Sequence, residues 1–236
     1  MAQSQDVPER FQHLIDEGYE VRMGDYINRG WQLFTADPWP LIAFYLLLMI
    51  GSFVVGLIPF VGSIAMMVIS PVLSAGMYIY IDKIAKGEER VFNDFFSAFN
   101  LLGPLFLGSF IGGMLTMLGF LFLLIPGIYL GVAYAFVVPL ITFAGLEFWP
   151  ALETSRKVVT KNWWALFGFM IVTGLIMFSG VILLFVGMFA TIPLGTCIIY
   201  AAYEDIFGER MDPMQSKIDE IGQEIQEIDY RDEDAF

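Results

Sequence analysis

Apolar residues along this chain gather in three long blocks, and charged residues are excluded from all three. The blocks span residues 38–81, 95–146 and 162–203. Each is long enough for two helices of about 20 residues, the length that crosses a ~30 Å hydrocarbon layer. Each also has a break near its middle, at 56–62, 124–127 and 186–188, where glycine or proline interrupts a helix. The pattern therefore predicts three helical hairpins.

The most apolar segment runs from Pro104 to Leu146 and contains no Asp, Glu, Lys, Arg, Asn, Gln or His. A helix that is apolar all round leaves no face for water, which is typical of a membrane span. We predict an all-α membrane protein whose six-helix domain covers residues 38–207, after an amphipathic segment at 1–37 and before an acidic tail at 208–236. The six spans are expected at 39–58, 61–84, 103–125, 127–147, 163–186 and 188–207.

A short amphipathic stretch stands before each hairpin, at 26–34, 91–99 and 150–163. Apolar residues at spacings of three and four, ending directly at a span, favour a helix that lies in the membrane interface. The residues expected to face inward are Ile27, Trp31 and Phe34, then Phe92, Phe95, Phe96 and Phe99, then Leu152, Val159 and Trp163. The chain thus resembles three degenerate, parallel copies of one unit around an axis along the membrane normal.

Each returning helix of a hairpin carries a proline, at Pro71, Pro139 and Pro193. A proline inside a helix removes one backbone hydrogen bond and bends the helix. We therefore predict bends at all three, with those at Pro71 and Pro139 near the bilayer midplane.

All twelve Lys and Arg lie between the blocks or in the terminal segments. Basic residues close to span ends are retained in the cytoplasm, and Trp prefers the headgroup level. The prediction therefore places both termini and both long connections inside, together with all five Trp, which stand at block edges on that side. Three short, uncharged turns remain outside.

The apolar blocks contain no ionisable side chain, which disfavours polar-substrate transport and proton relay. Their hydroxyls are expected to bond to backbone or to neighbouring helices; they include Ser70, Ser74, Thr116, Tyr129, Tyr134, Thr142, Thr173 and Thr196. His13 and Cys197 are the single histidine and cysteine, so neither has a partner for a metal site or disulfide. We expect no catalytic set, no metal and no cofactor.

Two small-residue spacings occur in the second hairpin, Gly108-x-x-x-Gly112 and Gly127-x-x-x-Gly131. Such spacings let helix backbones approach closely. Packing within the bundle is favoured over a dimer contact.

Basic residues cluster in the two long connections, at Lys83, Lys86 and Arg90 and at Arg156, Lys157 and Lys161. They could bind anionic headgroups, at about 1 kcal/mol per basic residue near the surface. The favoured interpretation is a topology anchor.

In the acidic tail, Ile218, Ile221, Ile225 and Ile228 line one helical face. We predict that this stripe docks on the basic connections or on a partner, with a disordered tail as the alternative.

Several motifs resemble a widespread group of uncharacterised bacterial membrane proteins, and the membrane domain of some glycerophosphoryl diester phosphodiesterases. They are Ile125-Pro126-Gly127-Ile128-Tyr129-Leu130-Gly131, Val138-Pro139-Leu140, Ala151-Leu152-x-x-Ser155-Arg156 and Trp163-Trp164. The likeness covers about residues 24–207 and implies a shared fold in the bacterial inner (cytoplasmic) membrane. The phosphodiesterase domain is absent, so the resemblance implies no hydrolase activity.

The leading hypothesis is a non-enzymatic inner-membrane scaffold or accessory subunit that acts through its cytoplasmic face. Its expected partners are membrane lipids and another subunit or a second copy of this chain, with no nucleic acid. The alternative is a transporter or flippase-like protein for a lipid or apolar solute, built around the bent helices. An intramembrane enzyme is the third possibility, for which the sequence supplies no catalytic residues.

Overall fold

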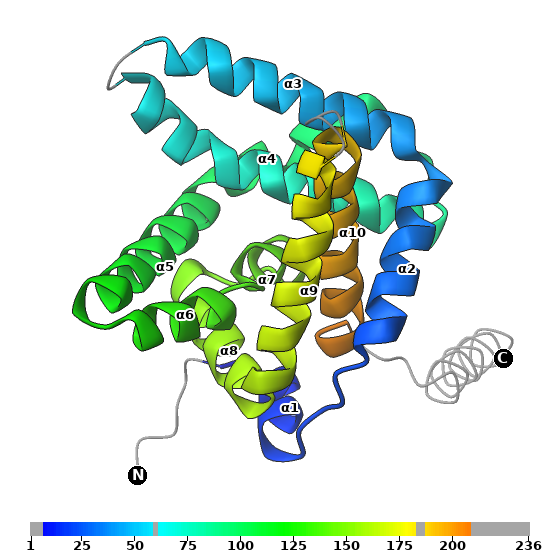
Figure 1. The fold of residues 1–236 in the computed structure, drawn as a ribbon. Helices are drawn as coiled ribbons and strands as arrows, with labels where there is room; N and C mark the ends of the chain where they lie inside the picture. The colour runs from blue at the N-terminus through cyan, green and yellow to red at the C-terminus, as the bar shows by residue number, and fades with distance from the viewer. Residues whose placement is uncertain (1–6, 59–60, 183–186, 209–236) are drawn as a thin grey trace, which may run out of the picture. The chain divides into compact units, whose positions relative to one another are not determined.

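The computed structural model describes residues 7–58, 61–182 and 187–208. The chain divides into two compact units, Met1–Ile206 and Phe207–Phe236, and the arrangement below is that of the first. Every regular element among the described residues is a helix (Figure 1). The predicted all-α class is confirmed.

We keep the word repeat as a label for each of the three predicted units. The first repeat consists of α2 (Met23–Ala36), α3 (Pro38–Gly56) and α4 (Val61–Lys86), after the short η1 (Glu9–Phe11) and α1 (Gln12–Asp16). Proline begins α3 because its fixed φ and missing N–H suit the first helical position. Gly87 follows α4 with φ 68°, a left-handed conformation that ends helices and that glycine adopts without strain.

The second repeat begins with η2 (Phe92–Leu101), a 3₁₀-helix, and continues through α5 (Leu102–Phe122), α6 (Leu124–Ala133) and α7 (Val137–Ala144). The third consists of α8 (Phe148–Lys161), α9 (Trp163–Ile182) and α10 (Met188–Ile206). We call α3, α5 and α9 the outgoing helices, and α4, α6–α7 and α10 the returning helices.

The fourth predicted helix is divided into α6 and α7 by a turn at residues 134–136. Pro139 is the third residue of α7. In a continuous helix its ring would collide with the carbonyl of Ala135, four residues earlier, which accounts for the interruption. By contrast, α4 and α10 continue through Pro71 and Pro193, so bends at those two residues stay predictions.

Five helices are long and apolar enough to cross a membrane: 38–56, 62–86, 92–122, 124–144 and 163–181. The predicted sixth span, α10, is not among them. Its last turn carries Glu204 and Asp205, whose charges lower the hydropathy of a helix that is otherwise apolar.

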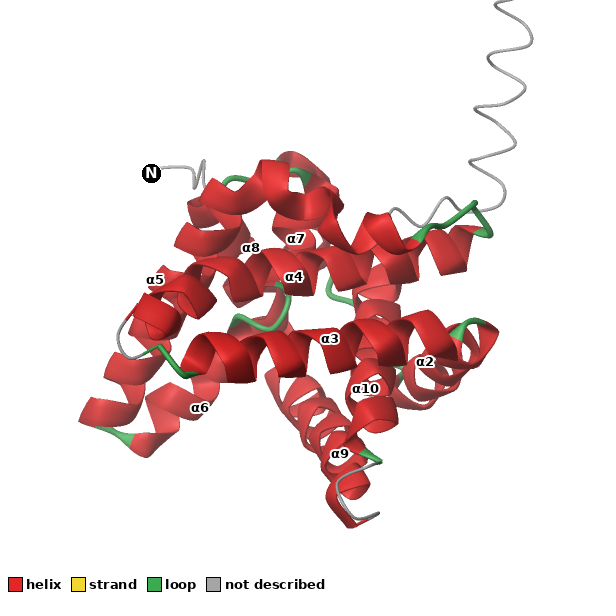
Figure 2. Ribbon diagram, turned by 90° about the horizontal axis from the view of Figure 1, so that it is seen from above, coloured by secondary structure: helices red, strands yellow, loops and turns green. Residues whose placement is uncertain are grey.

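The repeats pack in a cyclic order. Helices α2 and α3 contact α10, whereas η2 and α5 contact α4, and α8 and α9 contact α6. Each repeat therefore packs on the returning helix of the repeat before it, and the first packs on the last. The returning helices also meet one another, at α4–α7, α4–α10 and, through Phe143 and Tyr200, α7–α10. In Figure 2, α3 and α4 run side by side while α9 leads away from them.

Small residues allow close approach at the contacts between consecutive repeats, which we call seams. A Cβ added at Gly30 on α2 would lie 2.7 Å from Cα of Ile198 on α10. A Cβ at Gly76 on α4 would overlap the carbonyl oxygen of Phe95 on η2. At the third seam, Ser155 of α8 is fully buried and donates to the carbonyl of Ala133 at 2.6 Å.

The glycine spacings of the second hairpin also pack within the bundle, as predicted. Gly108 faces Ile141 and Val137 of α7, and Gly112 faces Leu152 of α8. Gly127 lies against Phe120, and Gly131 faces Thr116.

The inward face of α2 differs from the prediction. Trp31 is 54% exposed, whereas Tyr26, Gly30, Leu33 and Phe34 are buried. The close approach of Gly30 to α10 fixes which face is covered, and the next residue, Trp31, is turned about 100° away from it. In η2 the three-residue period of a 3₁₀-helix places Phe95 and Ala98 on one buried face and leaves Phe99 exposed. Phe92 shares the face of Phe95 but stands at the start of the helix and is also exposed.

Candidate functional site

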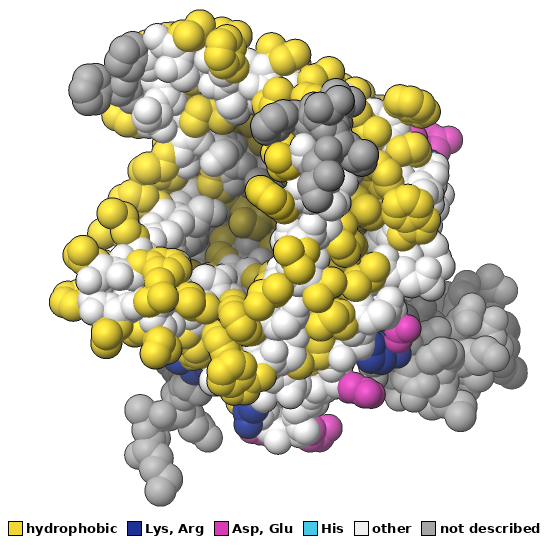
Figure 3. Space-filling view, in the orientation of Figure 1, with side chains coloured by type: hydrophobic (Ala, Val, Ile, Leu, Met, Phe, Trp, Pro, Cys, Tyr) yellow, Lys and Arg dark blue, Asp and Glu magenta, His cyan; other side chains and the backbone are white. Residues whose placement is uncertain are grey.

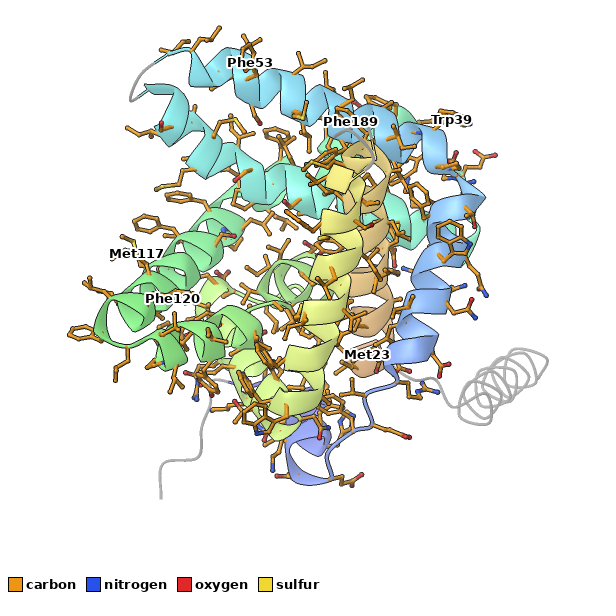
Figure 4. The ribbon with its side chains drawn as sticks, viewed as in Figure 1. Met23, Trp39, Phe53, Met117, Phe120 and Phe189 are labelled. Carbon is orange, nitrogen blue, oxygen red and sulfur yellow. The ribbon has the colours of Figure 1, made fainter. Side chains whose placement is uncertain are left out.

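Charged side chains gather at one end of the hairpins, where the outgoing helices begin and the returning helices end. We call this end the base, and the opposite end, around residues 58, 123 and 187, the tips. In Figure 3 the charged side chains lie along the right and lower edges, while the upper and left parts are hydrophobic. In Figure 4, Phe53 and Met117 mark the outgoing helices near two of the tips, where they are 70% and 74% exposed.

Three aspartates organise the base. Each accepts a hydrogen bond from a tyrosine hydroxyl and pairs with a basic residue, and we call these groups the aspartate nodes. The first joins α4 to α10, because Asp82 accepts from Tyr200 at 2.6 Å and pairs with Lys86 at 2.8 Å.

The second node joins the start of α3 to the end of α4. Asp37 accepts a hydrogen bond from Tyr80 at 2.8 Å, and Nε of Arg90 donates to the same oxygen at 2.9 Å. The hydrogen bond to Asp37 raises the pKa of Arg90, so the guanidinium remains charged at any physiological pH.

The third node joins α2 to α10. Asp205 pairs with Arg22 and accepts from the Tyr26 hydroxyl at 2.8 Å. Burial raises the pKa of Tyr26, and the neighbouring Asp205 carboxylate raises it further. The Tyr26 ring also packs edge-on against Phe169 of α9, with centroids 5.6 Å apart, so one side chain links three helices.

An aromatic stack packs against the tyrosine of the second node. The Phe95 ring lies between those of Phe44 and Tyr80, with centroids 4.0 and 4.2 Å away and interplanar angles of 11° and 12°. Phe44 and Phe95 are fully buried. The stack fixes the orientation of Tyr80 and therefore the place where its hydroxyl meets Asp37.

Five of the six basic residues singled out in the sequence pair with carboxylates of the same unit. Besides Lys86 and Arg90, Lys83 pairs with Asp94 at 2.8 Å, and Arg156 and Lys157 both approach Glu153, at 2.7 and 3.7 Å. These ion pairs compete with an anionic headgroup or an acidic tail for the same charges. Binding of either stays a prediction.

The sixth, Lys161, lies beside an open depression of about 580 Å³. Asp16, Glu17 and Glu20 line the same depression, so its net charge is negative and opposes an acidic ligand. The residues of the predicted tail stripe lie outside the described residues.

The motif residues of the second and third repeats come together at their seam. The Tyr129 hydroxyl lies 2.7 Å from Oγ1 of Thr160, and Nε1 of Trp163 donates to the Tyr129 carbonyl at 3.4 Å. Trp163 also stacks on Phe167, with centroids 4.9 Å apart. These motifs therefore have a packing role, whatever else they do.

Three of the hydroxyls singled out in the sequence bond to the backbone of their own helix. Thr116, Thr142 and Thr196 each donate to the carbonyl four residues earlier, as predicted. Thr173 is 1% exposed and its hydroxyl has no hydrogen-bond partner among the described residues. Within the same part of the chain, no group of three or more His, Cys, Asp or Glu is placed to hold a metal ion.

Two recesses lie between the apolar helices. A groove of about 400 Å³ follows α2 where it meets α9 and α10. Figure 3 also shows the surface hollowed between α4, α5 and α9.

Sequence reasoning missed the acidic half of the base. Asp37, Asp82, Asp94 and Asp205 each stand within a turn or two of the end of an apolar block, beside the basic residues that predicted topology. That coincidence, with a tyrosine in the last turns of α4 and α10, is the signal that could have revealed them.

The fold and the base define an all-helical protein with several helices apolar enough to cross a membrane. Ion pairs join these helices at one end. Comparison with protein-family models, curated proteins and solved structures found no match. The resemblance to phosphodiesterase membrane domains therefore stays a prediction.

Proposed function

We propose that this chain is a six-span inner-membrane scaffold or accessory subunit, non-enzymatic, that presents its base to another protein on the cytoplasmic side. The observation that carries the proposal is the contrast between base and tips. The aspartate nodes hold α2, α3, α4 and α10 in a fixed relation at the base. A surface held in this way is preorganised, which lowers the entropic cost of binding a partner.

The cytoplasmic placement of the base rests on the positive-inside rule. To test it, single cysteines at Ser63, Ile125 and Gly187 would be treated with an impermeant thiol reagent in a Cys197→Ser background. Gly127 is unsuitable, because a Cβ there would overlap the Phe120 ring, whereas Ile125 is 78% exposed. Labelling of these tip positions from outside, with protection of Lys161→Cys, supports the topology; the reverse pattern contradicts it.

The scaffold role is tested by photo-crosslinking in intact cells. Glu17, which is exposed at the base, would be replaced by a photoreactive residue. We expect it to form discrete adducts with another protein, which mass spectrometry would then identify. The matched control is Leu121, which is 77% exposed near a tip and should yield lipid adducts. Protein adducts from the tip alone, or from neither position, contradict the proposal.

A second candidate is a transporter or flippase-like role for a lipid or apolar solute. The hollow between α4, α5 and α9 favours it, because helices that diverge leave space for an apolar molecule. Reconstitution into vesicles with a fluorescent phospholipid in one leaflet would test it. A transbilayer rate equal to that of protein-free vesicles contradicts this role and leaves the scaffold proposal intact.

A further inference from the structure

The groove beside α2 lies at the seam that closes the ring, between the third repeat and the first. It has a volume of about 400 Å³ and is bounded by α2, α9 and α10. Its lining is apolar except for one amide, and consists of Gly24, Ile27, Asn28, Trp31, Ile176, Leu194 and Ile198.

The groove exists because α2 carries glycine on the side that borders it. By contrast, Phe95 fills the seam between the first two repeats, stacked on Phe44 and Tyr80. An added Cβ at Gly24 would meet nothing within 4 Å, whereas Gly30 is pressed against Ile198. The close approach at Gly30 sets the helix spacing, and the missing side chain at Gly24 leaves the space open.

Water is a poor occupant of this groove. A buried water molecule needs two to four polar partners, and an apolar recess binds apolar molecules instead. Asn28 is the one polar side chain in the lining.

One wall of the groove belongs to α9, whose exposed side chains suit lipid. On the same helix as Ile176, the side chains of Ile171, Leu175 and Phe178 are 46%, 63% and 64% exposed. At the α2 edge, Trp31 is 54% exposed beside Asn28, and an indole with a polar neighbour is typical of the headgroup level.

We propose that this groove holds one acyl chain of a membrane phospholipid, whose headgroup lies at Trp31 and Asn28. The inference rests on the proposal that α9 and α10 lie in the membrane. The bound lipid would complete the seam between the third and first repeats in the way that Phe95 completes the next one.

The test uses the full chain in vesicles that contain a phospholipid with a photoreactive acyl chain. After irradiation, the crosslinked peptides are identified by mass spectrometry. We expect adducts concentrated on α2 and on the part of α10 around Leu194, at several times the yield per residue found on α3 and α5. Uniform labelling of all exposed apolar surfaces would show ordinary solvating lipid and overturn the proposal.

Two variants fill the groove independently. Gly24→Leu adds a side chain where none exists, and Ile176→Trp enlarges the opposite wall from α9. Each should reduce the adducts on α2 several-fold. Gly113→Leu is the matched control, because Gly113 on α5 also has open space around it and lies outside the groove; it should leave those adducts unchanged.

Unchanged α2 adducts in both groove variants would overturn the proposal, as would crosslinks from α2 to another polypeptide in place of lipid. Failure of the membrane proposal itself would appear separately, as protein that is absent from the vesicles.

Discussion

The outgoing helices and the returning helices α4 and α6–α7 are similarly apolar, yet they differ in burial. In the most apolar part of α3 and of α9, 11% and 22% of residues are buried, against 44% in α4. The returning helices meet at the centre of the ring and carry Pro71, Pro139 and Pro193, whereas the outgoing helices surround them. Hydropathy therefore does not show which helices are central in the bundle. The position of a helix is determined by its small residues and by the polar residues at its ends.

The largest effect is expected for Phe95, in the aromatic stack on α4. Phe95→Ala removes a fully buried ring and should lower the free energy of unfolding by about 3–5 kcal/mol. Unfolding can be followed with a thiol-reactive dye, since Cys197 is the single cysteine and is buried. Phe178→Ala on the outgoing α9, where the ring is 64% exposed, should change stability by less than about 0.5 kcal/mol. Equal losses in the two variants would contradict the central position of α4.

A smaller loss is expected from a single added methyl group. In Gly76→Ala the Cβ would overlap the Phe95 carbonyl oxygen, and because the obstacle is backbone, relief requires α4 and η2 to separate at a cost of about 1–3 kcal/mol. Gly51→Ala on the outgoing α3 has open space and should be neutral or slightly stabilising, because alanine favours helix. The same dye assay compares them, and a stable Gly76→Ala protein would show that the seam is not closely packed.

The aspartate nodes should contribute less individually. Tyr200→Phe removes the hydrogen bond to Asp82 but leaves the Lys86 pair, so we expect a loss of about 1 kcal/mol. Tyr45→Phe, on the outgoing α3, is the matched control. An equal loss of stability in Tyr45→Phe and Tyr200→Phe would contradict the role of the first aspartate node in holding α4 and α10 together.

The smallest effect concerns pH. The pKa of Tyr26 is raised from its ordinary value of 10.0, first by burial. The folded protein therefore keeps the phenol proton at a pH where the unfolded chain releases it, so stability is fully present below pH 10 and decreases above it. Tyr26→Phe should reduce this alkaline loss, measured as the difference in unfolding midpoint between neutral pH and pH 11. An identical pH dependence in both proteins would contradict the burial of this hydroxyl.

Much of the helix pattern follows from local sequence. Pro38 and the Leu-Ile-Pro-Gly turn at 124–127 indicate where helices begin, and the apolar blocks indicate their lengths. The interruption at residues 134–136 was expected only as a bend, because sequence does not show whether neighbouring helices will satisfy the freed backbone groups. The predicted inward face of α2 is partly wrong. The contact that orients this helix joins Gly30 to Ile198, which is far away in the sequence.

The aspartate nodes could not be predicted either, because each joins residues that are far apart in the sequence. Tyr200 and Asp82 are separated by 118 residues, and Tyr26 and Asp205 by 179. Charge counting assigned the basic residues to topology but did not show that Arg22 would pair with Asp205, or Arg90 with Asp37, far away in the sequence. The motifs that contain Tyr129, Ser155 and Trp163 are visible in the sequence. That they lie together at one seam follows only from the cyclic packing of the repeats.

The closed ring also has a consequence for biogenesis. Helix α2 packs on α10, but a ribosome that makes about 5–20 residues per second needs roughly 10–30 s to travel from Ala36 to Ile206. During that interval the Tyr26 and Leu33 side of α2 has no α10 to cover it. The packing surface of α2 is therefore completed only after α10 has been synthesised.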